Sequence, residues 1–101
     1  MPGVSTSLPG SRIPQAVEVR VSAELLEVRL SDGRTISAPL NWYPRLADGS
    51  LAERNHWQLL GDGHGIHWPE LDEDISVENL LLGQRSGESP QSLAKWRSRR
   101  L

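Results

Sequence analysis

Residues 17–39 decide the fold, and their sequence is VEVRVSAELLEVRLSDGRTISAP. Apolar and polar side chains alternate along them, which predicts half-buried β-strands. The side chains expected on the buried face are Val17, Val19 and Val21 in a first strand, Leu26, Val28 and Leu30 in a second, and Ile36 and Ala38 in a third over residues 34–38. Asp32-Gly33 predicts a tight turn between the last two, because glycine adopts positive φ without steric cost. Pro39 ends the third strand, since proline has no N–H to donate. The stretch therefore predicts a three-stranded antiparallel meander.

A second hairpin is predicted further along the chain. Residues 57–60 and 65–68 have the composition of strands, and Gly61-Asp62-Gly63 between them favours a turn. The spacing Gly61-x-Gly63-x-Gly65 also occurs in phosphate-binding loops. Such loops open a helix and lie near positive charge, whereas this one precedes a short strand that Pro69 ends. A hairpin is therefore the preferred interpretation.

Short helices are expected around these strands. Ser50 and Glu53 have the spacing of a capping box, which predicts a helix over 51–56. Ser76 is a suitable cap for a helix over 77–82, and Ser89-Pro90 for a C-terminal helix with Leu93 and Trp96 on one face. Together these elements predict an α+β core domain over residues 16–84, with a mainly antiparallel sheet and short helices. A disordered leader over 1–15 precedes it, and a linker with a basic C-terminal helix over 85–101 follows.

The composition narrows the class of protein. The 101 residues are enough for one small domain, and the absence of cysteine excludes disulfides, thiol catalysis and thiolate metal sites. No apolar run approaches the roughly 20 residues of a membrane span, and the leader lacks the apolar core of a secretory signal. We therefore expect a cytoplasmic protein that does not act at a membrane.

The aromatic residues are unusual, because there are four Trp and one Tyr but no Phe. Trp and Tyr carry a polar group and are enriched at interfaces. Trp57 is expected in the core, whereas Trp42 and Trp68 suit either the core or an exposed recognition surface. Trp96 stands on a basic segment, and we expect it to meet another surface.

The charges are segregated along the chain. Eight acidic residues and one arginine lie between residues 48 and 78, whereas five basic residues and one acid lie between 85 and 101. The acidic centre can attract the basic end within one molecule, or each can face a partner. Arg45 and Arg54 are expected to pair with the central acids. Lys95, Arg97, Arg99 and Arg100 suit contacts with phosphate groups, so a nucleic-acid-associated transcriptional regulator is one alternative function.

Histidine and acidic residues gather between residues 64 and 74. His64 and His67 precede Asp72, Glu73 and Asp74, and these residue types bind metals or act as acids and bases. Residues three apart on a strand point to opposite faces, so the two histidines are not expected to converge. We expect a solvated acidic loop that favours the following helix. A metal- or acid-dependent enzyme at His64, His67 and Asp72 is a second alternative.

Several motifs resemble the bacterial domain of unknown function 2442 family. They are Ser31-Asp32-Gly33-Arg34, Pro39-Leu40-x-Trp42-x-Pro44-Arg45-Leu46, Arg54-x-x-Trp57, Gly61-x-Gly63-x-Gly65-Ile66-His67-Trp68-Pro69-x-Leu71-Asp72-Glu73-Asp74-Ile75-Ser76-Val77 and Leu80-Leu81-x-Gly83. The resemblance spans about residues 17–83, and Ser92–Trp96 is similar to a common extension. It implies a small α+β domain without established catalytic residues. It also implies an antitoxin-like role beside a small protein encoded nearby.

The sequence therefore favours a non-enzymatic, antitoxin-like protein-interaction module that binds a small, toxin-like partner protein. No cofactor, metal or catalytic residue is expected, and a homodimer is compatible with the sequence. The residues expected to contact the partner are Trp42, Arg45, Trp68, Asp72, Glu73, Asp74 and Trp96. A charged loop would steer association and an aromatic anchor would supply binding energy.

Overall fold

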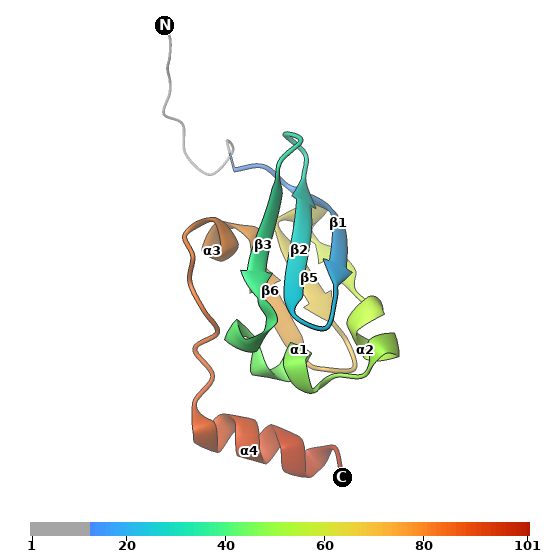
Figure 1. The fold of residues 1–101 in the computed structure, drawn as a ribbon, viewed down its shortest axis with the longest axis vertical. Helices are drawn as coiled ribbons and strands as arrows, with labels where there is room; N and C mark the ends of the chain where they lie inside the picture. The colour runs from blue at the N-terminus through green and yellow to red at the C-terminus, as the bar shows by residue number, and fades with distance from the viewer. Residues whose placement is uncertain (1–12) are drawn as a thin grey trace, which may run out of the picture.

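The computed structural model describes residues 13–101 and folds them into two small sheets with short helices and a separate C-terminal helix (Figure 1). The strands are β1 (Ala16–Val21), β2 (Leu25–Leu30), β3 (Thr35–Pro39), β4 (Gln58–Leu60), β5 (Gly65–Trp68) and β6 (Glu73–Ser76). The α-helices are α1 (Pro44–Asp48), α2 (Leu51–Asn55), α3 (Val77–Leu81) and α4 (Pro90–Arg99), and the 3-10 turns are η3 (Leu40–Trp42) and η4 (Gly61–Gly63). The prediction of an α+β fold is confirmed.

The first sheet is the predicted meander, with strand order β1-β2-β3 and antiparallel pairing throughout. Val19, Val21, Leu26 and Val28 face inward and are buried. Val17 is an exception, because a bulge between Ala16 and Glu18 shifts the register and leaves its side chain 44% exposed. The prediction that Val17 is buried is wrong, since a bulge breaks the two-residue period of a strand.

The second sheet contains one strand more than the predicted hairpin. Its order is β4-β5-β6, and β6 pairs antiparallel with β5, so that Ile75 lies opposite Ile66 and Asp74 opposite His67. Glu73 and Asp74 therefore belong to an edge strand, and the expectation that they lie in a loop is wrong. A short strand rich in acids lacks the alternating apolar residues by which strands are recognised in sequence.

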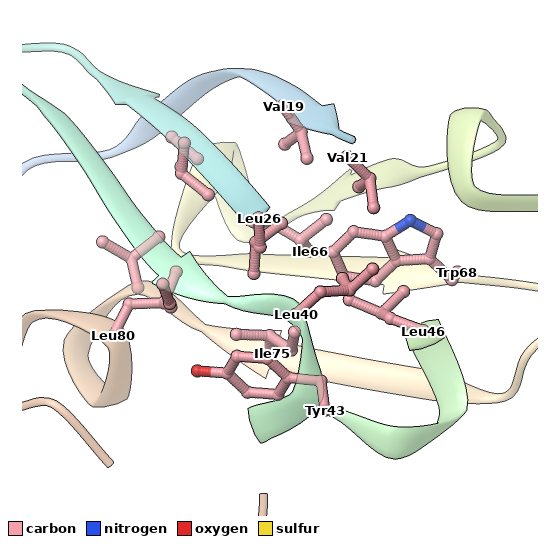
Figure 2. Close-up of a cluster of buried hydrophobic side chains, with 14 of the residues drawn as sticks. Val19, Val21, Leu26, Leu40, Tyr43, Leu46, Ile66, Trp68, Ile75 and Leu80 are labelled. Atoms are coloured by element: carbon pink, nitrogen blue, oxygen red, sulfur yellow. The ribbon is translucent and has the colours of Figure 1, made fainter. Parts of the chain in front are cut away.

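The core lies between the two sheets and is closed by η3, α1 and α3. Figure 2 shows the Trp68 ring among Val21, Ile66 and Leu46. Trp68 and Leu46 are both 0% exposed, and the Trp68 indole N–H donates to the Arg54 carbonyl at 3.0 Å. The indole is thus buried with its one donor satisfied, as buried tryptophan normally is. The other aromatic at this end, Tyr43, is 3% exposed.

The capping predictions for the short helices are confirmed. Ser50 and Glu53 form a complete capping box at α2, and the Ser76 hydroxyl accepts from the Asn79 N–H at α3. Ser89 caps α4 in the same way, through the Ser92 N–H. These caps satisfy backbone donors that a helix leaves unpaired at its N-terminus.

Residues 1–12 of the predicted leader lie outside the described residues. At its described end, the Gln15 N–H donates to the Ser31 hydroxyl at 3.0 Å. At the other end of the chain, α4 lies beyond α1 and away from both sheets (Figure 1). Within residues 13–101, no helix has the length and apolar character needed to cross a membrane.

Candidate functional site

The first feature of interest is the attachment of α4 to the rest of the molecule. We call residues 16–84 the body and residues 85–101 the arm. The arm is anchored by Trp96, which is 3% exposed. The Arg45 guanidinium carbon lies 5.4 Å from the centre of its ring and that of Arg100 lies 4.7 Å from it. Each guanidinium is attracted to the ring face, so the indole connects a cation of the body with a cation of the arm.

A two-point ion pair fixes the start of the arm. The Arg45 Nε donates to Glu88 Oε1 at 2.6 Å and its Nη2 donates to Glu88 Oε2 at 2.8 Å. The Ser92 hydroxyl also donates to Glu88 Oε2, at 2.5 Å. These hydrogen bonds, with Arg45 first, hold the pKa of Glu88 below its usual value. The pair is partly shielded from water, because only 7% of the Glu88 side chain is exposed.

The same arginine reaches the turn before β6. Its Nη1 donates to the Asp72 carbonyl at 2.9 Å and lies 3.4 Å from Asp72 Oδ2. Asp72 has a positive φ of 52°, a conformation that aspartate tolerates better than most residues. Arg45 therefore ties α1, the acidic turn and the arm together at one point.

Two further arginines attach the far end of α4. Arg97 Nε donates to Asp48 Oδ2 at 2.5 Å, and Arg100 Nη2 donates to Glu53 Oε1 at 2.8 Å. The same Glu53 oxygen accepts the Ser50 N–H of the capping box at 2.8 Å, and Arg100 and this cap together lower the pKa of Glu53. The acidic centre and the basic end thus meet within one molecule, which was one of the two expectations from the charge segregation.

The second feature is a polar pocket of about 200 Å³ beside β6. Its walls come from β6, α3, Tyr43 and the linker, and the lining residues are Tyr43, Glu73, Asp74, Ile75, Ser76, Asn79, Gln84, Arg85, Ser86 and Gly87. The Tyr43 hydroxyl donates to the Gln84 carbonyl at 3.3 Å, and the Ser86 N–H donates to the Trp42 carbonyl at 3.1 Å. Both bonds hold the linker in place as one wall of the pocket.

Glu73 is the unusual residue of this pocket. Its Oε1 accepts the Asp74 N–H at 3.1 Å, whereas its Oε2 is buried and has no hydrogen-bond partner. Burial raises the pKa of Glu73 to about 7, and the neighbouring carboxylates Glu88 and Asp74 add to the increase. Arg45 acts in the opposite direction, but burial outweighs its attraction, and a buried carboxylate of this kind favours its protonated form.

The structure brings together part of the predicted partner-binding set. Arg45, Asp72 and Trp96 meet where the arm joins the body, and Glu73 lies beside them in the polar pocket. Trp42 is half-buried, and the Arg85 guanidinium carbon lies 4.8 Å from its ring centre. Asp74 points to the outer face of the second sheet, where it pairs with the ring of His67.

Two tryptophans of the predicted partner-contact set are buried within the chain. Trp68 is a core residue, because its ring fills the space between the sheets, and it offers no surface to a partner. Trp96 meets another surface as expected, but that surface is the body of its own chain. Trp57 is partly buried against the core. Arg54, expected to pair with acids, instead donates to the carbonyls of Leu46 and Ala47 at the end of α1.

Of the four basic residues expected to contact nucleic acid, two form ion pairs within the chain. Arg97 and Arg100 are paired with Asp48 and Glu53, while Lys95 and Arg99 form no ion pair in the described part of the chain. For the metal alternative, residues 13–101 contain no group of three or more His, Asp or Glu side chains suited to a metal ion. His64 ends the turn before β5, whereas His67 on β5 pairs with Asp74.

Glu88 and Asp48 were missed as site residues. Glu88 is the only acid among the basic residues of the arm. This isolated position is the sequence feature that could have identified it as a site residue. Asp48 was counted only as part of the acidic centre. Neither pairing is readable from spacing, because the partners are 43 and 49 residues apart in sequence.

Comparisons with known proteins locate the body within a family. The family model described as "Protein of unknown function (DUF2442)" matches residues 16–86. No curated protein is significantly similar to the chain. A crystal structure of a protein of unknown function from Rhodospirillum rubrum has 28% identity and a TM-score of 0.65, covering 74% of this chain and 93% of that one. The solution structure of an uncharacterised protein from Chromobacterium violaceum has 18% identity and a TM-score of 0.62, covering 80% of this chain and 74% of that one, and shows a shared fold.

Proposed function

The chain belongs to the DUF2442 family of proteins of unknown function, as its motifs predicted, and from that premise we propose that it is a non-enzymatic, antitoxin-like protein-interaction module. Its partner is a small, toxin-like protein encoded by a neighbouring gene. The match ends at Ser86, before α4 begins. The family match thus covers the body and the first two residues of the arm.

The observation that supports this function is the way the body holds α4. A basic helix with a single aromatic anchor lies on an acidic surface, through Trp96 and the pairs Arg97–Asp48 and Arg100–Glu53. Peptide recognition in protein complexes uses the same elements, in which a buried aromatic residue supplies affinity and charged pairs set the register. The molecule therefore presents a binding surface of defined charge and shape.

We assign the partner contact to the exposed side of α4 and the acidic residues next to its attachment point. Lys95 and Arg99 are exposed on α4, and Asp72 is exposed at the turn that Arg45 holds. Neighbouring patches of opposite charge steer association with a partner of complementary pattern. In this arrangement α4 is held ready for the partner, so binding does not have to order it.

The test uses the purified product of the neighbouring gene and the full-length chain. Isothermal titration calorimetry is expected to give a saturable complex, and Trp96→Ala is expected to weaken it roughly tenfold because α4 is no longer held in place. Arg20→Glu is the matched control, because Arg20 is an exposed arginine on the outer face of the first sheet. It should leave the affinity unchanged.

Two results would contradict the proposal. One is the absence of any complex at about 100 μM of each protein, well above the concentrations at which specific complexes form. The other is a tighter complex with Trp96→Ala, which would show that α4 occupies the partner's place and does not contribute to its surface.

A further inference from the structure

We propose that Glu73 makes the attachment of the arm depend on pH: the arm is held while the buried carboxyl group keeps its proton, and it loosens when the proton leaves to water. This goes beyond the proposed function, because it concerns the chain alone and needs no partner. Three features carry it, namely the sealed carboxyl group of Glu73, the charges around that group, and the attachment of the arm next to it.

Glu73 lies on an edge strand of the second sheet with its side chain turned inward. It stands opposite Trp68, and it shares the inner face of β6 with Ile75, two residues further along the strand. Its Oε1 accepts the Asp74 N–H, whereas its Oε2 is sealed from solvent and has no hydrogen-bond partner. A neutral carboxyl group tolerates this position at the cost of one unmade hydrogen bond. An ionised one would be a buried charge whose second oxygen lacks a donor, which costs far more.

Ionisation of Glu73 therefore requires a change in its surroundings. Either water reaches Oε2, for which a wall of the pocket must move, or a cation must turn toward it. The linker is the wall without regular secondary structure, over residues 84–89. It is held by isolated hydrogen bonds, among them those from the Tyr43 hydroxyl to the Gln84 carbonyl and from the Ser86 N–H to the Trp42 carbonyl. A segment held in this way opens locally more readily than a paired strand.

The charges around Glu73 connect its ionisation to the arm. Arg45 attracts the Glu73 carboxylate and Glu88 repels it, and these two residues form the two-point pair at the start of the arm. A negative charge on Glu73 thus competes with Glu88 for Arg45 and repels Glu88. Only Gly87 separates Glu88 from Ser86 of the linker wall. Opening of the wall and weakening of the pair therefore displace the same segment.

The other charged and titratable groups near Glu73 leave this competition in place. Together with the pair itself, the groups that surround the site are Tyr43 before α1, Arg45 on α1, Asp72 before β6, Asp74 on β6, and Arg85 and Glu88 around the linker. Arg85 is the second cation of this set, and its guanidinium lies over the ring of Trp42. Burial raises the pKa of Glu73 to about 7, so the proton is exchanged in the physiological range.

The experiment is native-state trypsin digestion of the full-length chain and of Glu73→Gln at pH 6, 7 and 8, with the cut sites identified by mass spectrometry. The ratio of the two cleavage rates after Lys95 cancels the pH dependence of trypsin itself. A carboxyl group with a pKa of about 7 in the held state and 4.5 in the open state predicts that this ratio, wild type over variant, rises roughly tenfold from pH 6 to pH 8. Glu27→Gln, on the outer face of the first sheet, is the matched control, and its ratio to the wild type should stay constant.

A second cut site separates the arm from the whole chain. Cleavage after Arg29 in β2 requires the body to unfold, so it should be much slower than cleavage after Lys95 at every pH. Equal rates at the two sites, or a ratio of wild type to Glu73→Gln that does not change with pH, would overturn the proposal.

A further background tests the coupling through Arg45. When Glu88→Gln is present in both proteins, the competing charge is gone, so the rise from pH 6 to pH 8 should be clearly smaller than tenfold. An unchanged tenfold rise in this background would contradict the part given to the Arg45–Glu88 pair.

Discussion

The carboxylate of Glu88 accepts two hydrogen bonds from the guanidinium of Arg45, at 2.6 and 2.8 Å, across 43 residues of sequence. This pair fastens the segment just before α4 to the body. Both side chains are mostly shielded, with 14% of Arg45 and 7% of Glu88 exposed. A shielded two-point pair of this kind contributes geometry as well as energy.

Replacing Glu88 should loosen the arm. Glu88→Ala leaves the Arg45 guanidinium partly buried without its main partner, and we expect a loss of about 2 kcal/mol in the free energy of unfolding. Urea denaturation measures it. Glu18→Ala is the control, since Glu18 forms an exposed pair with Arg29 and exposed pairs contribute about 0–1 kcal/mol. Equal losses in the two variants would contradict the role given to Glu88.

Removing the aromatic anchor should free α4 while the body stays folded. Trp96→Ala deletes the residue that α4 buries most deeply, and burying a large aromatic side chain stabilises by about 3 kcal/mol. Trypsin is expected to cut after Lys95 and Arg97 much faster in this variant. Leu101→Ala is the control, because Leu101 is fully exposed. Unchanged cleavage in Trp96→Ala would show that the arm is held without its tryptophan.

The stability of the protein should depend on pH through Glu73. Its pKa is raised in the folded state to about 7 from 4.5, so folding favours the protonated form. The contribution is fully present below pH 4.5 and is lost as the pH rises through 7. Glu73→Gln cannot ionise, so the variant should match the wild type at low pH and exceed it at pH 8 by at most about 3 kcal/mol.

Thermal or urea unfolding of both proteins at several pH values measures this difference. The comparison with Glu73→Gln is needed because Glu88 acts in the opposite direction. The pKa of Glu88 is lowered in the folded state, so its contribution is lost as the pH falls. A stability difference that stays constant with pH would rule out a folded-state pKa near 7 for Glu73.

Two glycines provide a matched pair of substitutions. Gly63 has a φ of 97°, and a Cβ atom there would lie 2.4 Å from the Ala16 carbonyl oxygen. Gly83 has a φ of 73°, with open space around the position of a Cβ. We expect Gly83→Ala to cost about 1 kcal/mol from the backbone alone. Gly63→Ala adds a clash with a main-chain atom that cannot move aside, so the loss of stability by urea denaturation should be several times larger. Similar losses would contradict this account.

The meander could be predicted because its signal is local. Leu26, Val28 and Leu30 alternate with polar residues, and Asp32-Gly33 marks the turn between two strands. The capping box of Ser50 and Glu53 is equally local. Val17 was misplaced because a bulge depends on how two strands pair, and β6 was missed because its pairing with β5 outweighs the low strand preference of its acids.

The candidate site was harder to predict because its contacts join distant parts of the chain. Arg45 and Trp96 were both chosen from the sequence, but their contact with each other has no signature in spacing. Trp68 shows the opposite difficulty, since one tryptophan suits a core and a surface equally well until its neighbours are known. The segregation of charge did indicate that the basic end and the acidic centre can attract each other, which the pairs of Asp48 and Glu53 demonstrate.

The order of the elements along the chain determines which apolar surface is exposed during translation. The strands of the first sheet, whose inner face carries Val19, Val21, Leu26 and Val28, are complete at Pro39. The residues that cover this face, Ile66, Trp68 and Ile75, follow about thirty residues later in the sequence. As the chain leaves the ribosome, the meander therefore has an apolar face before the second sheet that covers it has been synthesised. The nascent chain therefore exposes an apolar surface that is buried in the complete protein.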